Sequence, residues 1–125
     1  MDKNIKSSQQ LKEFLDFIQQ VIGDYQYHLE AMKVEDKRSQ DLLHEIELGP
    51  SKNKDRVATK LRKSRKERRV HKDYVEIHQS LYDFITSQRG KDCKHDLEAI
   101  LGTLRKEEKR KTSRIYIPRV KEETQ

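Results

Sequence analysis

The sequence has few of the residues that build a large or cross-linked core. It contains no tryptophan, and hydrophobic residues make up only 32% of the chain against 40% charged residues. A monomer of 125 residues with this composition would bury a thin core, so we expect self-association to supply the missing burial. Cys93 is the only cysteine, which excludes an intrachain disulfide and fits a reducing compartment.

Long apolar runs are also missing. No stretch approaches the roughly 18 apolar residues of a membrane-spanning helix, and no apolar segment of signal-peptide length follows Met1. We therefore expect a protein of the host-cell cytosol that does not enter a membrane.

Positive charge is concentrated in one block rather than spread along the chain. The formal net charge is +6, to which residues 1–50 contribute −4, residues 51–72 contribute +9 and residues 73–125 contribute +1. The middle block holds eleven bases and only two acids. Such a block attracts an anionic partner, which can be nucleic acid, a nucleotide or an acidic protein surface.

Apolar residues recur at helical spacing in the first part of the chain. Two seven-residue series, four residues apart, predict one apolar stripe on a helix over residues 8–48: Leu11, Ile18, Tyr25, Met32 and Ile46 in one, and Leu15, Ile22, Leu29 and Leu43 in the other. A polar run at residues 35–41 interrupts the stripe. Gly49 and Pro50 predict the end of the helix, with Gly49 in a left-handed cap.

Two further helices and an extended arm are expected. The second helix covers residues 53–88, and spacings of three and four residues predict that its second half has one buried face: Val70, Tyr74, Ile77, Leu81, Phe84 and Ile85. The third helix covers residues 92–109, with Asp92 as its N-cap. Residues 113–120 are rich in β-branched and aromatic side chains and contain a proline, which favours a strand-like arm.

The lengths of the first two helices favour an elongated molecule. A helix of 35–40 residues is about 55–60 Å long, whereas a compact globule of this size is only about 35 Å across. Either the helices break, near Asp36 and Lys63, or they extend and pair with another chain. We favour a mainly α fold: a long antiparallel helical hairpin with a third helix and a short C-terminal β arm, forming a homo-oligomer.

The basic block has two interpretations. Its side chains can be solvated and paired with acids of the first helix, such as Glu35 and Asp36. Alternatively, bases three and four residues apart share one helix face, so that Arg62, Arg65 and Arg69 form an anion site in which each guanidinium bonds two phosphate oxygens.

No catalytic or metal-binding motif is recognisable. His71 and His78 are seven residues apart, which does not match the spacing of zinc-binding histidines, and there is neither a glycine-rich phosphate loop nor a paired-carboxylate motif. We therefore expect no metal, no cofactor and no enzymatic activity.

Aromatic and arginine residues in the last third of the chain are the inventory of a nucleotide site. Tyr82 and Phe84 lie at the end of the second helix. Arg114 and Tyr116 would share one face of an extended arm, whereas Arg119 falls on the other face unless Pro118 shifts the register. An aromatic ring can stack on a base, and arginines can hold its phosphates. The alternatives are that Phe84 packs in the core and that the arm is an ordinary edge strand.

The order of several short motifs resembles a known family. Between residues 41 and 120 these motifs are Asp41-Leu42-Leu43-His44-Glu45-Ile46-Glu47-Leu48, Lys60-Leu61 through Arg65, Arg68-Arg69, Lys72-Asp73, Leu81-Tyr82-Asp83-Phe84-Ile85 and Arg114-x-Tyr116-x-Pro118-Arg119-Val120. Their order resembles small helical proteins from phages and prophages of Firmicutes, in particular the first-described type of Thoeris anti-defence protein.

The resemblance implies a function that the residues alone do not name. Such proteins are homo-oligomeric sponges that bind cyclic ADP-ribose isomers and block an immune signal without cleaving it, and some also hold cyclic oligonucleotides at separate sites. By this resemblance Phe84 or Tyr82 would stack on the base, while Arg114 and Arg119 would hold the phosphates. Two other functions compete: a nucleic-acid-binding phage accessory protein using residues 52–72, and a helical inhibitor of a host protein.

Overall fold

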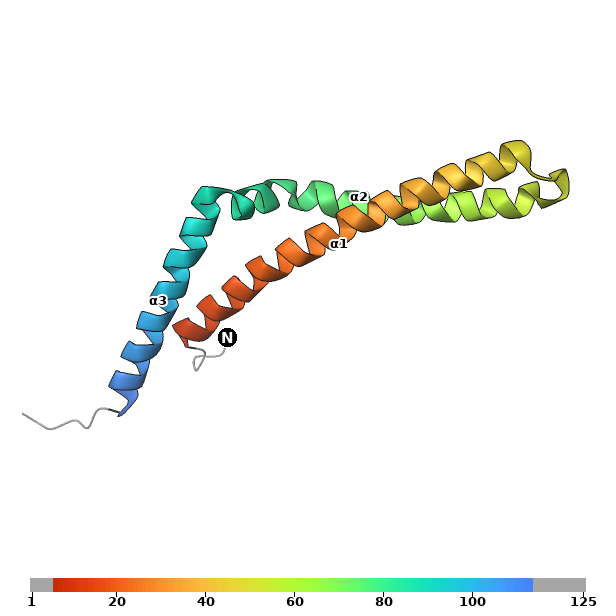
Figure 1. The fold of residues 1–125 in the computed structure, drawn as a ribbon. Coiled ribbons are helices and arrows are strands. Elements are labelled where there is room, and N and C mark those ends of the chain that lie inside the picture. The colour runs from red at the N-terminus through yellow and green to blue at the C-terminus, as the bar shows by residue number, and fades with distance from the viewer. Residues whose placement is uncertain (1–5, 114–125) are drawn as a thin grey trace, which may run out of the picture.

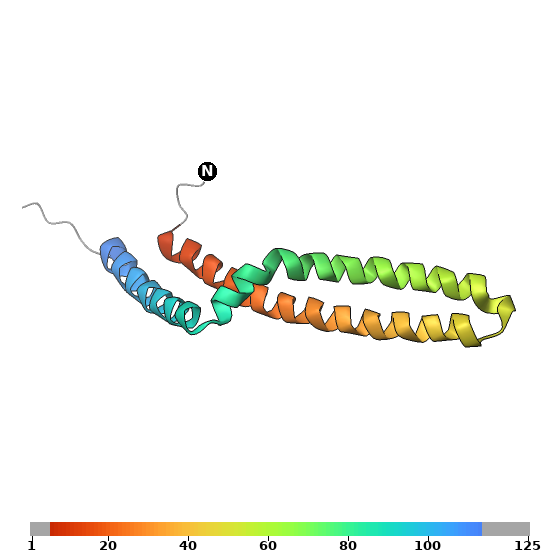
Figure 2. The same cartoon turned by 90° about the horizontal axis from the view of Figure 1, so that it is seen from above.

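The computed structural model describes residues 6–113 of the chain, and within them the protein is mainly helical, as predicted. The elements are α1 (Ser7–Leu48), the 3-10 turn η1 (Ser51–Asn53), α2 (Lys54–Thr86) and α3 (Gln88–Ser113). α1 and α2 form a long antiparallel hairpin, and α3 turns back toward the start of α1 (Figure 1). Seen from above, α1 and α2 run side by side from the tip of the hairpin (Figure 2).

α1 continues without a break through the polar run at residues 35–41, and its 42 residues are about 63 Å long. Glu35 is buried there, and Ser64 of α2, which is only 2% exposed, donates a hydrogen bond of 2.9 Å to its carboxylate. Arg38 donates to both carboxylate oxygens of Glu35, at 2.7 and 2.9 Å. The polar run therefore supplies a polar contact between the two helices rather than a bend.

The turn between α1 and α2 differs from the predicted left-handed cap. Gly49 has a φ of −85° and a ψ of 172°, which is extended backbone, so the prediction of a left-handed glycine was wrong. Glycine is required here for space, because a Cβ at this position would lie 2.5 Å from the carbonyl oxygen of Glu45. The same oxygen accepts a hydrogen bond of 2.8 Å from the Gly49 N–H.

The turn between α2 and α3 was predicted too late in the chain. α3 begins at Gln88, four residues before the expected start, and Asp92 lies inside it rather than at its N-cap. Ser87 is the cap, since its Oγ accepts a hydrogen bond of 3.1 Å from the Gly90 N–H. Gly90 lies in the first turn of α3, so it does not end the second helix as a C-cap.

A small set of apolar side chains holds the helices together. The buried hydrophobic residues of the described chain are Leu15, Ile18, Val21, Tyr25, Leu42, Val57, Val75, Ile85 and Leu101. Ile18, Val21 and Ile85 form one cluster, against which Ile22 and Leu81 pack. The stripe predicted for the first helix is confirmed at Leu15, Ile18 and Tyr25, but it was wrong at Leu43, which is 38% exposed while Leu42 is buried instead.

The face predicted to be buried on the second helix is largely exposed. Val70, Ile77 and Phe84 are 61%, 73% and 45% exposed, and Val75 is buried instead. Over most of its length α2 has α1 as its only neighbour among the described residues, so only one narrow strip of α2 is covered. The predicted face is confirmed only at its C-terminal end, where Ile85 is buried against Ile18 and Val21 of α1 and Leu81 packs beside it.

The free ends of α1 and α3 meet at one hydrogen-bonded contact. Glu108 accepts hydrogen bonds from the Ser8 N–H at 3.1 Å and from the Ser8 hydroxyl at 2.5 Å. These two bonds, with the charges of Lys6 and Arg105, lower the pKa of the Glu108 carboxyl. Ser8 is thereby held against α3.

Two remaining expectations concern the arm and the membrane. Ser113, the first residue of the predicted arm, is the last residue of α3, and the rest of the arm lies outside the described residues. Within residues 6–113, none of the helices combines the length and apolar character needed to cross a bilayer.

Candidate anion-binding site

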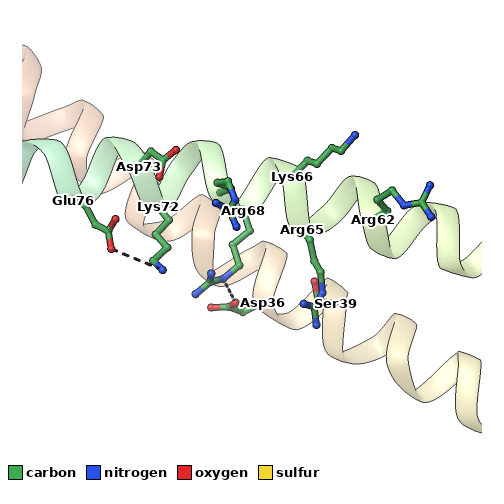
Figure 3. Close-up of a pocket in the computed structure, with 10 residues that line it drawn as sticks. Asp36, Ser39, Arg62, Arg65, Lys66, Arg68, Lys72, Asp73 and Glu76 are labelled. Atoms are coloured by element: carbon green, nitrogen blue, oxygen red, sulfur yellow. Dashed lines mark hydrogen bonds and ion pairs between the residues drawn. The ribbon is translucent and has the colours of Figure 1, made fainter.

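Basic side chains gather along the middle of α2 and line a hollow of about 580 Å³. We call this the basic hollow, and it is lined by Asp36, Ser39, Arg62, Arg65, Lys66, Arg68, Arg69, Lys72, Asp73 and Glu76. All except Asp36 and Ser39 come from α2, where they follow one another at helical spacing (Figure 3). The hollow therefore depends on one continuous helix and on the neighbouring part of α1.

Only some of these cations are paired with acids. Arg68 forms an ion pair with Asp36 across the hairpin, and Lys72 lies 3.9 Å from Glu76 on its own helix. None of the ion pairs formed within residues 6–113 involves the four other cations of the hollow, which are Arg62, Arg65, Lys66 and Arg69. The predicted pairing with the acidic first helix thus occurs at Arg68 and leaves most of the block available.

The side chains of the hollow leave α2 in different directions. In Figure 3, Arg65 points toward Ser39 on α1, beside the Arg68–Asp36 pair, whereas Arg62 and Lys66 point away from α1. Arg65 and Arg69 are four residues apart, so their side chains are neighbours on the helix surface. An anion seated between them could be contacted by two guanidinium groups at once.

The chemistry of the lining favours phosphate over an apolar ligand. The hollow combines six cationic side chains with three carboxylates, and none of its ten lining residues is aromatic or aliphatic. Ligand sites for drug-like molecules are usually lined by apolar side chains, which are missing from this lining. Guanidinium groups instead bind phosphate through two parallel hydrogen bonds.

The structure brings together the residues predicted for the anion site but not those predicted for the nucleotide site. Arg62, Arg65 and Arg69 do lie together, in the basic hollow. Tyr82 stacks on Tyr25, with ring centroids 3.8 Å apart, and its hydroxyl accepts a hydrogen bond of 3.3 Å from Gln26. One face of the Tyr82 ring is therefore already occupied.

The rest of the predicted nucleotide site is only partly described. Phe84 is 45% exposed, so it is not packed in the core. It lies fifteen residues beyond Arg69 on the same helix, about 22 Å along the axis, and is not part of the basic hollow. Arg114, Tyr116 and Arg119 lie outside the described residues.

A cluster of histidine and tyrosine rings joins α1 to α2 and was not recognised from the sequence. The Nδ1 atoms of His28 and His71 are 2.8 Å apart, so one of them donates a hydrogen bond to the other. His28 also stacks on Tyr74 at 4.1 Å, and Tyr74 stacks on His78 at 3.9 Å. The heptad spacing of His71 and His78 was visible, but their partner on α1 was not.

This cluster perturbs two titrating groups. Burial lowers the pKa of His28, and the charges of His71 and His78 lower it further, while Asp24 acts in the opposite direction. Burial and the charge of Asp24 raise the pKa of Tyr74. Within residues 6–113, no three or more His, Cys, Asp or Glu side chains are arranged to hold a metal ion.

Comparison with known proteins adds no evidence about this site. No family model, no curated protein and no solved structure matches the chain. The function is therefore argued from the basic hollow and from the arrangement of the helices.

Proposed function

We propose that this protein binds a phosphate-rich nucleotide in the basic hollow and sequesters it without cleaving it. The observation that carries the proposal is the group of four cations, Arg62, Arg65, Lys66 and Arg69, that take part in no ion pair within residues 6–113. The volume of the basic hollow supports the same conclusion, because about 580 Å³ lies within the 300–1,000 Å³ typical of small-ligand sites.

In its most specific form, the proposed ligand is a cyclic ADP-ribose isomer or a cyclic oligonucleotide. This form rests on the resemblance described above, which implies an anti-defence sponge. The cyclic ADP-ribose isomer would use a second site, separate from the basic hollow, in which its base stacks on Phe84, whose ring is exposed, in preference to Tyr82, whose ring is stacked on Tyr25. Arg114 and Arg119, with Tyr116 beside them, would complete that second site.

Nucleic acid is a second candidate, favoured by the basic side chains that continue beyond the hollow. Lys52, Lys54, Arg56, Lys60 and Lys63 are all exposed. From Lys52 to Lys72 they extend the positive surface over about 30 Å. A surface of this length can follow a phosphate backbone, whereas a mononucleotide would use only a part of it.

Calorimetric titration of the full chain tests the proposal. The titrants are cyclic ADP-ribose isomers, a cyclic dinucleotide, pyrophosphate, and single-stranded and duplex oligonucleotides at two salt concentrations. Charge-assisted hydrogen bonds contribute about 1.5–3 kcal/mol each, so Arg65→Ala or Arg69→Ala should weaken phosphate binding about 10- to 100-fold. Arg110→Ala is the matched control, because Arg110 is exposed on α3 and pairs locally with Glu107.

The outcomes separate the candidate ligands. Tight binding of a cyclic nucleotide that is recovered with unchanged mass supports the sponge. Binding only to oligonucleotides, with a steep salt dependence, supports the nucleic-acid function instead. Equal affinities in wild type, Arg65→Ala and Arg69→Ala for every titrant would exclude the basic hollow as a binding site.

We also propose that the protein is a homo-oligomer. The described residues bury only nine hydrophobic side chains, which is a thin core for two helices of 42 and 33 residues. Association with a second copy would bury more apolar surface on both chains.

A further inference from the structure

We propose that Ser8, at the start of α1, and Glu108, near the end of α3, form a latch that closes α3 onto the hairpin. When this end latch opens, the first turns of α1 and the last turns of α3 lose their protection from hydrogen exchange together, while the rest of the hairpin stays folded. The latch lies about 47 Å along α1 from Ser39 in the basic hollow, so the proposal does not depend on ligand binding there.

The start of α1 depends on α3 for its hydrogen-bond acceptor. The first N–H groups of a helix have no partner within the helix, and an oxygen of the N-cap side chain commonly accepts from them. Here the N-cap is Lys6, whose side chain has no acceptor atom and forms no cap hydrogen bond, and the first turn of α1 contains no acid. The acceptor comes instead from Glu108, one hundred residues away in the sequence, to which both the N–H and the hydroxyl of Ser8 donate, at 3.1 and 2.5 Å.

The two residues of the latch occupy matching positions at the ends of two apolar stripes. On α1, spacings of three and four residues place four side chains on one face: Ser8, Leu11, Leu15 and Ile18. On α3, the same spacings do so for Leu97, Leu101, Leu104 and Glu108. The two helices run in opposite directions, so the polar ends of the stripes meet, whereas Lys94 donates a hydrogen bond of 3.0 Å to Gln19 nearer the turn between α2 and α3 (Figure 1).

Burial makes the two halves of the latch depend on each other. Ser8 is only 7% exposed, although it is polar and lies in the first turn of its helix. If α3 stayed closed without a carboxylate at position 108, the N–H and the hydroxyl of Ser8 would be buried without an acceptor, which is costly. Water reaches both groups fully only when α3 moves away. Loss of the hydrogen bonds and separation of the two helix ends are therefore one event.

The surrounding charges favour the closed latch. The contact borders a hollow of about 390 Å³, whose lining includes the cations Lys6, Arg105 and Lys109 and a single acid, Glu108. A carboxylate is also stabilised at the N-terminus of a helix, where the unpaired N–H groups carry partial positive charge. Three cations and a helix terminus thus act on one carboxylate, and no second acid in this lining can take its place.

The contacts farther along the hairpin do not depend on α3. Ser64 donates to the buried carboxylate of Glu35, and His28 lies against His71, so both contacts join α1 to α2 alone. Helix ends open at a lower free energy than packed helix centres, and segments that share contacts open as one unit. Opening of the end latch therefore releases the two helix ends without separating the hairpin.

Hydrogen exchange of the full chain, followed by mass spectrometry, tests the latch through its reciprocity. Glu108→Ala should accelerate amide exchange about 10-fold or more in the first turns of α1, and Ser8→Ala should do so in the last turns of α3, because each removes a charge-assisted hydrogen bond. Alanine is the best helix former, so a change in helix propensity alone would slow exchange in α3 of Glu108→Ala. The matched controls are Glu107→Ala, since Glu107 pairs locally with Arg110, and Ser7→Ala, since Ser7 is exposed. Acceleration confined to the substituted helix, or equal acceleration in the controls, would overturn the latch.

The double variant Ser8→Ala with Glu108→Ala distinguishes one shared contact from two independent ones. Once the carboxylate is gone, Ser8→Ala removes no further bond, so both helix ends should exchange about as fast in the double variant as in Glu108→Ala alone. Peptides covering residues 60–72 should exchange as in wild type in every variant, because the hairpin stays closed there. Faster exchange of those peptides, multiplied effects in the double variant, or complete exchange of both ends of wild type at the earliest time would overturn the end latch.

Discussion

Mild acidification should destabilise the hairpin through the contact between His28 and His71. The two Nδ1 atoms are 2.8 Å apart, and one must accept the hydrogen bond that the other donates. When both imidazoles are protonated, neither Nδ1 can accept, and two like charges face each other. The hydrogen bond is lost and replaced by repulsion.

The direction in which stability changes with pH follows from the lowered pKa of His28. The unfolded state, with an ordinary histidine pKa near 6.5, binds the proton more readily than the folded state. Stability is therefore fully present above about pH 6.5 and falls as the pH drops below it. Asp24 offsets part of the effect, whereas His71 and His78 add to it.

The expected size is about 1–2 kcal/mol between pH 7.5 and 5. A hydrogen bond contributes about 0.5–1.5 kcal/mol, and each unit of difference in pKa between the two states contributes about 1.4 kcal/mol. The expected loss of stability is at the lower end of what these two contributions would give together, because both rings are partly exposed and solvent screens their charges. Glu108 also has a lowered pKa, but its contribution is lost only at more acidic pH, near the range of ordinary carboxyl groups.

Urea denaturation followed by circular dichroism at several pH values provides the assay. Wild type should lose stability on acidification, while His28→Gln should lose less because position 28 no longer titrates. His95→Gln is the control, since His95 is exposed on α3. The same pH dependence in wild type and His28→Gln would refute the reasoning.

Two further predictions concern the core and the second turn. Val21→Ala should lower the free energy of unfolding by about 2 kcal/mol, because Val21 is 2% exposed and loses two buried methyl groups; urea denaturation measures it, and a loss below about 0.5 kcal/mol would contradict it. Gly90→Ala should cost about 1–3 kcal/mol in the same assay, because its Cβ would lie 1.8 Å from the carbonyl oxygen of Phe84 and the backbone must shift. Gly102→Ala is its control: a Cβ there meets nothing within 4 Å, so alanine should stabilise α3 by up to about 1 kcal/mol.

The helices themselves could be predicted from the sequence because each carries a regular apolar stripe. The start of α3 could not, because Ser87 and Gly90 look like turn residues until the hydrogen bond between them is known. The buried state of Val70 and Ile77 was predicted wrongly for a different reason. Periodicity shows that one helix face is apolar, but only the position of the neighbouring helix decides whether that face is covered.

In the candidate site too, features set by spacing along one helix could be predicted, whereas features set by contacts between two helices could not. The grouping of Arg62, Arg65 and Arg69 follows from spacing on one helix, so it was predicted. The pairing of Arg68 rather than its neighbours with Asp36 depends on the register of α1 against α2, which spacing does not give. The same register brings His28 against His71, and that contact was missed.

The sequence marks the register of α1 against α2 at only one place, which is the polar run that interrupts the apolar stripe. A stripe with a seven-residue repeat can pair with a partner after a slip of seven residues, since apolar residues again meet apolar ones. Glu35 breaks this equivalence, because only the observed register places its buried carboxylate against Ser64. A slip of one heptad would set it opposite Val57 or His71, and burial of a carboxylate beside valine without a donor is costly. The polar contact in the middle of the hairpin therefore selects the register, and that register holds Asp36 against Arg68 while leaving Arg65 and Arg69 free of ion pairs within the described chain.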